Sequence, residues 1–240
     1  PLAERADSTR QSAEEIGRVL ELSGMGGRWP IALGGDPLQY SDVPSESAGA
    51  DFIIETAMRH SPDNPLWIAV LGACTNTASA YLKCPEIAER VVVLFHGRTM
   101  HWPVKCYNFN VIGDLKAVRV LFASDLPLVL FDTGTYLSAP VEETQRRLSG
   151  CGRIGAYLHE IRTRRDEYAD PRKGFFDLGD IAFLLDPSLT YWEEVAAPGV
   201  GWDLRYTWDS DCGRMIRVYQ IDRDRTLELL YAKLTAAYPR

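Results

Sequence analysis

Small and polar residues follow three apolar runs of the sequence, and they are the first candidates for chemistry. They occupy positions 72–76, 96–99 and 132–135. In an open parallel sheet, ligands bind beyond the carboxyl ends of the strands. These segments are therefore expected to line a pocket, with Thr75, His96 and Asp132 gathered on one rim. The same residues also fit ordinary turns and helix caps, with Thr75 capping the helix that follows it.

Two further polar stretches precede helical patterns, at residues 107–110 (YNFN) and 175–180 (FFDLGD). An aspartate at a helix N-terminus usually acts as a cap, which is worth about 1 kcal/mol. Asp177, taken alone, is therefore expected to be a capping residue. It becomes a candidate for chemistry only together with other polar groups.

The three apolar runs are expected to be central strands of one sheet. Residues 66–72 (LWIAVLG), 90–95 (RVVVLF) and 126–131 (LPLVLF) are rich in β-branched residues and lack the alternation of a strand that faces water on one side. Helical patterns separate them, at 75–83, 85–90 and 114–123. This order predicts right-handed crossovers and parallel strands. The predicted fold class is α/β, a three-layer sandwich with a mostly parallel central sheet.

The remaining elements are predicted to be mostly helices. Helical patterns cover residues 8–22, 47–60, 141–148, 154–168, 178–185 and 225–237. Residues 30–35 (PIALGG) predict a short strand. Residues 201–208 and 214–222 alternate apolar and polar side chains, which predicts a small antiparallel element near the C-terminus. No repeat or low-complexity segment interrupts the chain, so a single domain over residues 1–240 is predicted.

The composition excludes several classes of partner. The chain has 26 Lys and Arg against 33 Asp and Glu, a formal net charge of −7. Such a charge repels nucleic acid and anionic lipid. No apolar run reaches the roughly 18 residues that span a bilayer, and the start PLAERADSTR has no signal or transit pattern. The sequence predicts a soluble protein that binds a small molecule, with neither nucleic acid nor a membrane as partner.

The cysteines and histidines do not form a transition-metal pattern. The five cysteines are widely spaced and contain no CxxC pair, and the four histidines have no HxxxH or HxH spacing. An odd number of scattered cysteines fits reduced thiols better than a disulfide framework, which predicts a cytoplasmic location. A zinc site is not expected.

Four segments together resemble the inosine-uridine type nucleoside hydrolases. The string LGACTNTASAYLKCPEIAERVVVLFHG resembles the family's strand, G-x-x-T-N turn and helix, and NFNVIGDLKAV resembles its E-F-N-x-x-x-D-P motif. FDLGDIAFLLDP resembles H-D-P-x-A-x-A-x-L-L-D-P, and SAGADFIIETAM resembles the S-A-x-x-F-I-I-E helix. The segments follow the family's order, and the resemblance covers the chain from about residue 8 to its end.

The resemblance implies hydrolysis of an N-ribosidic bond at a calcium ion. Thr75 would offer its backbone carbonyl and Asp177 its carboxylate to the metal, while Asn110 would bind the ribose. Calcium takes six to eight oxygen ligands, which can include sugar hydroxyls. Cleavage passes through an oxocarbenium-like transition state, so it needs an activated water and help for the departing base. A nucleoside or riboside is the expected partner, in a homodimer or homotetramer.

The sequence departs from the family at three places. It has no D-x-D-x-G-x-D-D motif, which supplies most metal carboxylates in the family. The chain is therefore expected to lack the first β-α-β unit, roughly 40 residues, and to bind calcium only where that motif is present. Phe176 replaces a histidine that protonates the leaving base, and phenylalanine cannot transfer a proton. Asn108 replaces a glutamate that binds a sugar hydroxyl. His96 and His101 are the other candidates for the acid.

Two other functions stay open. A catalytically degraded member of the family would bind a nucleoside, a sugar or a protein partner without turnover. An unrelated α/β enzyme would use Cys74, near His96, as a thiol nucleophile. Several aromatic residues fit either a wall for a base or the core; they are Trp102, Trp202, Tyr206 and Trp208.

Overall fold

The computed structural model of the chain describes residues 8–97, 101–134, 136–163, 172–208 and 212–238. The chain folds as two units. The first contains mainly Ala32–Thr133 and Tyr191–Gln220, and the second mainly Arg10–Ile31, Gly134–Thr190 and Ile221–Arg240. Two such units can belong to one domain or to two, so the single domain stays a prediction.

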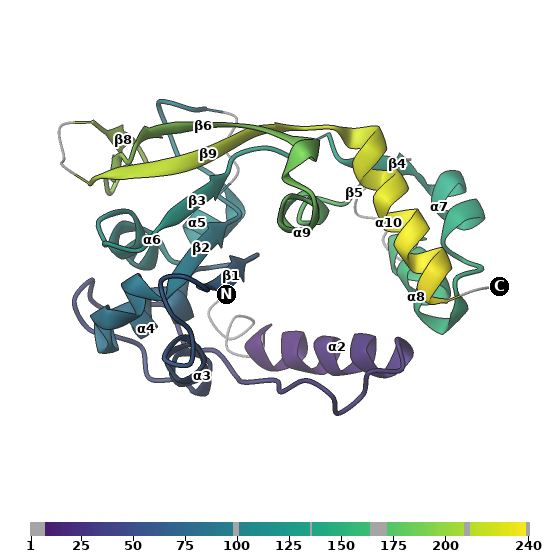
Figure 1. Cartoon of the computed structure of the whole chain (residues 1–240), viewed down its shortest axis with the longest axis horizontal. Coiled ribbons are helices and arrows are strands. Elements are labelled where there is room, and N and C mark those ends of the chain that lie inside the picture. Colours follow the sequence, from purple (N-terminus) through teal and green to yellow (C-terminus); the bar gives the residue numbers. More distant parts are fainter. Residues whose placement is uncertain (1–7, 98–100, 135, 164–171, 209–211, 239–240) are drawn as a thin grey trace. The chain divides into compact units, whose positions relative to one another are not determined.

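The main sheet has five strands in the order β1-β2-β3-β9-β6 (Figure 1). Their bounds are β1 Leu66–Val70, β2 Val91–Phe95, β3 Leu128–Phe131, β6 Thr190–Ala196 and β9 Arg214–Ile221. The pairs β1–β2, β2–β3 and β3–β9 are all parallel. The predicted α/β class with a mostly parallel central sheet is confirmed.

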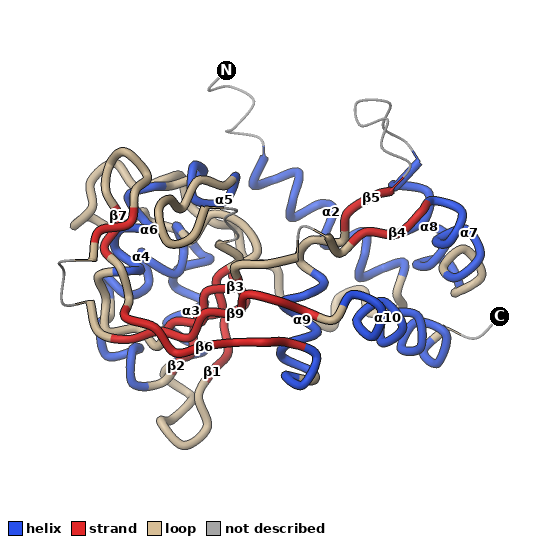
Figure 2. The backbone as a smooth tube through the Cα atoms, turned by 90° about the horizontal axis from the view of Figure 1, so that it is seen from above, coloured by secondary structure: helices blue, strands red, loops and turns tan. Residues whose placement is uncertain are grey.

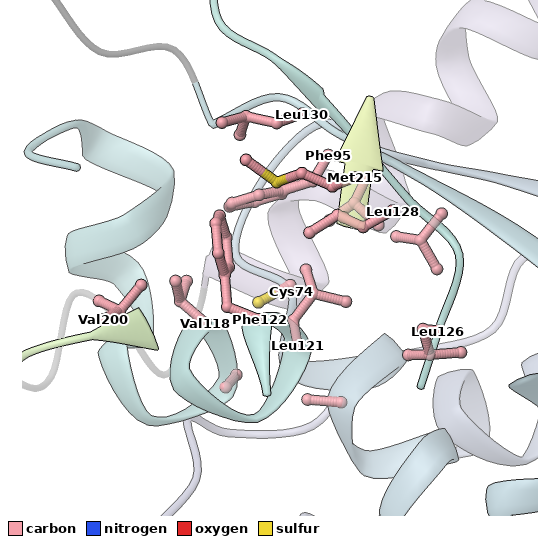
Figure 3. Close-up of a cluster of buried hydrophobic side chains, with 14 of the residues drawn as sticks. Cys74, Phe95, Val118, Leu121, Phe122, Leu126, Leu128, Leu130, Val200 and Met215 are labelled. Carbon is pink, nitrogen blue, oxygen red and sulfur yellow. The ribbon is translucent and has the colours of Figure 1, made fainter. Parts of the chain in front are cut away.

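The central strands are buried because their residues are apolar on both faces. All four residues of β3 are buried, and so are four of the five residues of β2. Phe95 and Leu130 pack with Phe122 and Met215 in the core of the first unit (Figure 3). The apolar runs without alternation therefore form the strands that are shielded from water.

The helices of the first unit follow the predicted pattern closely. They are α3 Ala48–Ala57, α4 Thr75–Lys83, α5 Phe109–Gly113 and α6 Leu115–Phe122, with the 3-10 helix η1 Pro85–Glu89. Side-chain caps define several of their starts. Ser47 Oγ accepts a hydrogen bond from Ala50 N at 3.1 Å, and Asp114 Oδ1 accepts one from Ala117 N at 3.0 Å.

The predicted strand at residues 30–35 is wrong, because the structure has no strand there. The backbone of this stretch is bound by helices instead of a neighbouring strand. Leu33 O accepts a hydrogen bond from Gly49 N at 2.8 Å, and Gly35 N donates to Asn76 Oδ1 at 2.9 Å. A Cβ atom on Gly34 would lie 2.6 Å from Asn76 Nδ2. Gly34 thus allows a close approach to Asn76 of α4.

The predicted pairing of residues 201–208 with 214–222 is also wrong. The later segment forms β9, which joins the main sheet beside β3 with Val129 opposite Ile216. Its Val218 side chain is fully buried there. A small antiparallel element does exist near the C-terminus, between β7 Gly199–Val200 and β8 Tyr206–Thr207.

The second unit is mostly helical (Figure 2). Its elements are α2 Ser8–Leu22, β4 Ser138–Pro140, α7 Val141–Arg147, α8 Gly152–Thr163, β5 Arg172–Gly174, α9 Leu178–Leu185, η2 Pro187–Leu189 and α10 Arg223–Ala237. The predicted helix 8–22 matches α2, whereas positions 164–168 of the helix predicted over 154–168 lie outside the described residues. In the part of the chain that is described, no helix is both long and apolar enough to cross a bilayer.

Tyr206 carries a buried hydroxyl that has no hydrogen-bond partner among the described residues. Burial raises the pKa of this phenol, so the group is neutral. Because an unsatisfied buried hydroxyl is unfavourable, Tyr206→Phe should increase the free energy of unfolding by about 1 kcal/mol and Tm by about 2–4 °C. The matched control is Tyr231→Phe, since the buried Tyr231 hydroxyl donates to Glu143 at 3.0 Å. Thermal unfolding should show a gain for the first variant and a loss for the second; a loss for both would contradict the expectation.

Candidate functional site

The carboxyl ends of β1, β2 and β3 lie at one edge of the main sheet, since the three strands are parallel neighbours. Thr75, His96 and Asp132 all follow these ends. All three are buried, with exposed fractions of 5% each. This is the rim that the sequence predicts, at the place where parallel sheets bind ligands.

Thr75 is held by a buried carboxylate rather than acting as a helix cap. It is the first residue of α4, and the N-cap position belongs to Cys74, which makes no capping hydrogen bond. Thr75 Oγ1 donates to Asp114 Oδ2 at 2.7 Å, and Leu38 N donates to the same oxygen at 2.9 Å. The capping interpretation of Thr75 is therefore wrong. Asp114 ties Thr75 to α6, which it caps.

His96 is packed into the edge of the sheet. Its backbone N donates to Val70 O at 3.0 Å, and its imidazole stacks on Phe131 with ring centroids 5.9 Å apart. Asn110 Nδ2 donates to the His96 carbonyl at 2.9 Å. This bond holds the start of α5 at the carboxyl end of β2.

Asp132 belongs to an ion pair at the end of β3. Its side chain is fully buried, and Oδ2 accepts a hydrogen bond from Arg217 Nε at 2.7 Å. Arg217 Nη1 donates to Glu193 Oε1 at 2.7 Å, and its guanidinium lies 4.6 Å from the centre of the Trp102 ring. Arg217 therefore joins β3, β6 and β9 to the segment that follows β2.

Asn108 is the N-cap of α5. Its Oδ1 accepts a hydrogen bond from Val111 N at 3.0 Å. Its Nδ2 is buried and has no hydrogen-bond partner within the described part of the chain. Asn108 is therefore a predicted sugar contact on which the structure leaves a buried donor unsatisfied.

Phe176 and Asp177 belong to the second unit, just before α9. The Phe176 side chain is 46% exposed. Asp177 occupies the N-cap position but makes no capping hydrogen bond with its side chain. The capping interpretation of Asp177 is therefore wrong. Asp180, in the first turn of α9, is fully buried.

His101 is exposed and lies in the segment between β2 and α5. Its backbone carbonyl accepts hydrogen bonds from Val104 N at 2.7 Å and Lys105 N at 3.0 Å. His101 and His96 both follow β2, but they differ in burial, because His96 is inside the fold.

Three of the four aromatic candidates pack against one another. The Trp102 ring lies 5.0 Å from Tyr206 and 5.3 Å from Trp208, centroid to centroid. Trp202 is separate, with the Arg119 guanidinium 4.3 Å from its ring centre. Trp102, Tyr206 and Trp208 therefore form a packed cluster, in which Tyr206 is buried and Trp208 is 45% exposed.

Cys74 does not have the environment of a nucleophile. It is 1% exposed, and burial together with the charge of Asp114 raises the pKa of its thiol. Burial likewise raises the pKa of Cys106 to about 11. Because only thiolates react rapidly, iodoacetamide at pH 8 should leave both residues unmodified in the native protein and label them after denaturation. Rapid labelling of Cys74 in the native protein, measured by peptide mass spectrometry, would instead support Cys74 as a thiol nucleophile.

Sequence reasoning missed the two residues that hold this edge together. Asp114 stands before a helical pattern, which signals a cap, but nothing in the pattern indicates its bonds to Thr75 and Leu38. Arg217 lies in an alternating strand, where an exposed side chain is the usual expectation. Its pairing with Asp132 crosses 85 positions of sequence.

Three solved structures of nucleoside hydrolases are similar to the chain. The plant nucleoside hydrolase PpNRh1 has a TM-score of 0.66 at 20% identity, covering 89% of this chain and 72% of that one. A purine-preferring ribonucleoside hydrolase from Gardnerella vaginalis has a TM-score of 0.62 at 20% identity, covering 91% and 74%. An inosine-uridine preferring nucleoside hydrolase from Bacillus anthracis has a TM-score of 0.57 at 18% identity, covering 79% and 65%. At these identities, the likeness establishes the fold.

The sequence itself identifies the family. No curated protein matches the chain significantly. The model of the family described as inosine-uridine preferring nucleoside hydrolase, however, matches residues 5–226, which is most of the chain. The chain therefore belongs to the inosine-uridine preferring nucleoside hydrolase family.

Proposed function

We propose that the chain hydrolyses the N-glycosidic bond of a ribonucleoside or a related N-riboside at a calcium site. The observation that carries this proposal is the family match over residues 5–226. Polar residues at the carboxyl edge of the parallel sheet support it, since that edge is the usual ligand site of such sheets.

The proposed calcium ligands on this chain are the Thr75 backbone carbonyl and the Asp177 carboxylate. Oxygen donors of this kind fit calcium, which takes six to eight of them. The match of residues 176–187 to the family's H-D-P-x-A-x-A-x-L-L-D-P motif supports the part of Asp177. The other ligands would be water, sugar hydroxyls and the aspartates of the family's D-x-D-x-G-x-D-D motif, so calcium is expected to bind only where that motif is present. Bound calcium lowers the pKa of a coordinated water, which makes it a better nucleophile.

The proposed contacts with the riboside are Asn108, Asn110 and Phe176. Asn110 Nδ2 donates to the His96 carbonyl. The Oδ1 atom of Asn110 is therefore the one proposed to accept a hydrogen bond from a sugar hydroxyl. The exposed Phe176 offers an apolar surface to the substrate, without a proton to donate.

Hydrolysis breaks the bond between the sugar C1′ and the base nitrogen, and water oxygen bonds to C1′. The leaving nitrogen needs a proton unless the departing base is a stable anion. We place this acid role on His96 or His101, the two histidines that follow β2. Asn110 binds the His96 backbone and so fixes the position of that residue.

A catalytically degraded protein that binds a nucleoside, a sugar or a protein partner is the second candidate. Phe176 favours it, because no proton donor stands at that position. We also infer a cytoplasmic location, which five unpaired cysteines support. A homodimer or homotetramer stays a prediction.

The two candidates separate in one assay. The purified protein is incubated with calcium and with inosine, uridine or 4-nitrophenyl riboside, and release of the base or nitrophenol is followed. The hydrolase should cleave the nitrophenyl riboside faster than inosine, since nitrophenolate leaves without a proton. A protein that binds uridine in calorimetry but releases no product from any substrate would be the degraded member.

A further inference from the structure

The first unit contains an open pocket at the amino ends of β3 and β9. Leu128, the first residue of β3, and Arg214, the first residue of β9, both line it. Its volume is about 540 Å³, and pockets that bind small molecules typically measure about 300–1,000 Å³. Asp132 follows the opposite end of β3, so this pocket is separate from the polar edge of the sheet.

The floor of the pocket is apolar. Leu121, Leu126, Leu128 and Ala197 line it, and all four residues are buried. The three leucines belong to the core of the first unit, where Figure 3 shows them with Phe122. Removing the apolar surface of a ligand from water is favourable. The floor therefore suits an apolar ligand body rather than a bare ion.

The rim of the pocket carries one acid and one base, Asp125 and Arg214, and both residues are exposed. The guanidinium of Arg214 is already paired with Glu194, because its Nε donates to a carboxylate oxygen of that residue. Asp125 belongs to no ion pair among the described residues. Its carboxylate therefore gives the rim a negative charge that no neighbouring side chain compensates.

The end of helix α6 adds to this negative charge. α6 ends at Phe122, and the residues that follow it, up to Asp125, line the pocket. The carbonyl groups at a helix C-terminus carry a partial negative charge, which stabilises nearby cations. Arg119, the basic residue in the last turn, donates to the Val200 carbonyl and is not among the described residues that line the pocket. A cation from solution can therefore take the position beside Asp125.

We propose that this pocket binds a small organic cation that has an apolar body. The ammonium group would lie between the Asp125 carboxylate and the end of α6, and the body would cover Leu121, Leu126 and Leu128. Electrostatic attraction favours a cation over an anion, and burial of the apolar body adds affinity. This site would be distinct from the proposed riboside site and independent of the proposed hydrolysis.

Three ligands of similar size test the class of ligand: 2-phenylethylammonium, 2-phenylethanol and phenylacetate. They share a phenyl group and differ in the charge at the other end. Calorimetry at low salt should give a Kd of about 1 mM or lower for the ammonium ion. This Kd should be at least about fivefold below that of the alcohol, and phenylacetate should bind more weakly still. Because Asp125 is exposed, the preference should decrease in about 0.5 M NaCl.

Asp125→Asn keeps the shape of the side chain and removes its charge. The affinities of this variant for the ammonium ion and the alcohol should agree within about twofold. Asp63→Asn is the matched control, because Asp63 is an exposed aspartate that is not among the residues lining the pocket. It changes the net charge by the same amount and should keep the preference for the ammonium ion.

Cys212 can locate the bound ligand, since it lines the pocket and is partly exposed. At about ten times its Kd, 2-phenylethylammonium should slow the alkylation of Cys212 by iodoacetamide about tenfold. Cys84 is also partly exposed but is not among the lining residues. Its alkylation rate should therefore stay unchanged, and peptide mass spectrometry measures both rates in one sample.

Equal affinity for the three ligands, or tighter binding of the alcohol or the anion, would overturn the proposed cation site. So would a preference for the ammonium ion that persists in Asp125→Asn, or a lack of binding of all three ligands at about 10 mM. Unchanged alkylation of Cys212 at a saturating concentration would contradict the location. None of these outcomes bears on the proposed hydrolysis, which is measured on ribosides.

Discussion

The Phe176→His variant should cleave inosine about 10²-fold faster than the wild-type protein. Phe176 is 46% exposed and directly precedes Asp177 at the start of α9. An imidazolium at this position would donate a proton to the base nitrogen as the glycosidic bond breaks, which phenylalanine cannot do. Cleavage of 4-nitrophenyl riboside should gain less than about threefold, because its leaving group needs no proton. Initial rates on both substrates test this difference.

The pH profile and a matched variant are the controls. The gain should fall as pH rises through the pKa of the new imidazole, about 6.5 for an unperturbed histidine, because only the protonated ring is an acid. Phe176→Gln adds polarity without an acid in this range and should not reproduce the gain. Fast inosine cleavage by the wild-type protein would contradict the reasoning and point to His96 or His101.

Asp177→Ala should reduce cleavage of both inosine and 4-nitrophenyl riboside, on the order of 10³-fold, because it removes a proposed metal ligand. The affinity for calcium, measured by calorimetry on the same protein, should fall in parallel. Loss of a metal ligand affects the attacking water. The better leaving group of 4-nitrophenyl riboside should therefore not restore the rate of this variant.

Asp186→Ala is the matched control for this loss. Asp186 is also the N-cap of a short helix in the second unit, and its Oδ1 accepts a hydrogen bond from Ser188 N at 3.1 Å. Its removal should cost about 1 kcal/mol of stability without a comparable loss of rate. An Asp177→Ala protein that keeps its rate and its calcium affinity would contradict the proposed role of Asp177.

Local patterns were sufficient to predict most of the fold. The bounds of α2 and α4 match the predicted helices, and β1, β2 and β3 are the parallel neighbours that their apolar runs indicate. A helix or a buried strand depends mainly on the periodicity of its own residues, which the sequence contains in full.

The errors in the predicted fold arose where contacts with residues distant in the sequence determine the structure. The apolar run at 30–35 forms no strand, because its backbone is bound by α3 and α4 rather than by another strand. The segment 214–222 alternates like a hairpin strand but pairs with β3, far away in the sequence. Strand pairing depends on long-range contacts that periodicity does not specify.

The residue types of the candidate site could be predicted from the sequence, but the contacts between those residues could not. Thr75 and His96 follow from the ends of the strands. The bond from Thr75 to Asp114 and the pair of Arg217 with Asp132 join residues 39 and 85 positions apart. Asn108 looks in the sequence like a substituted sugar contact, and only the structure reveals its unsatisfied Nδ2.

Product analysis in phosphate-free buffer with calcium tests the central claim most directly. A ribonucleoside, or 4-nitrophenyl riboside as the substrate with the best leaving group, is incubated with the protein, and the free base or phenol and the free sugar are quantified together. Hydrolysis by water predicts equal amounts of leaving group and ribose. No release of either product, or release that requires added phosphate and yields ribose 1-phosphate, would contradict the claim.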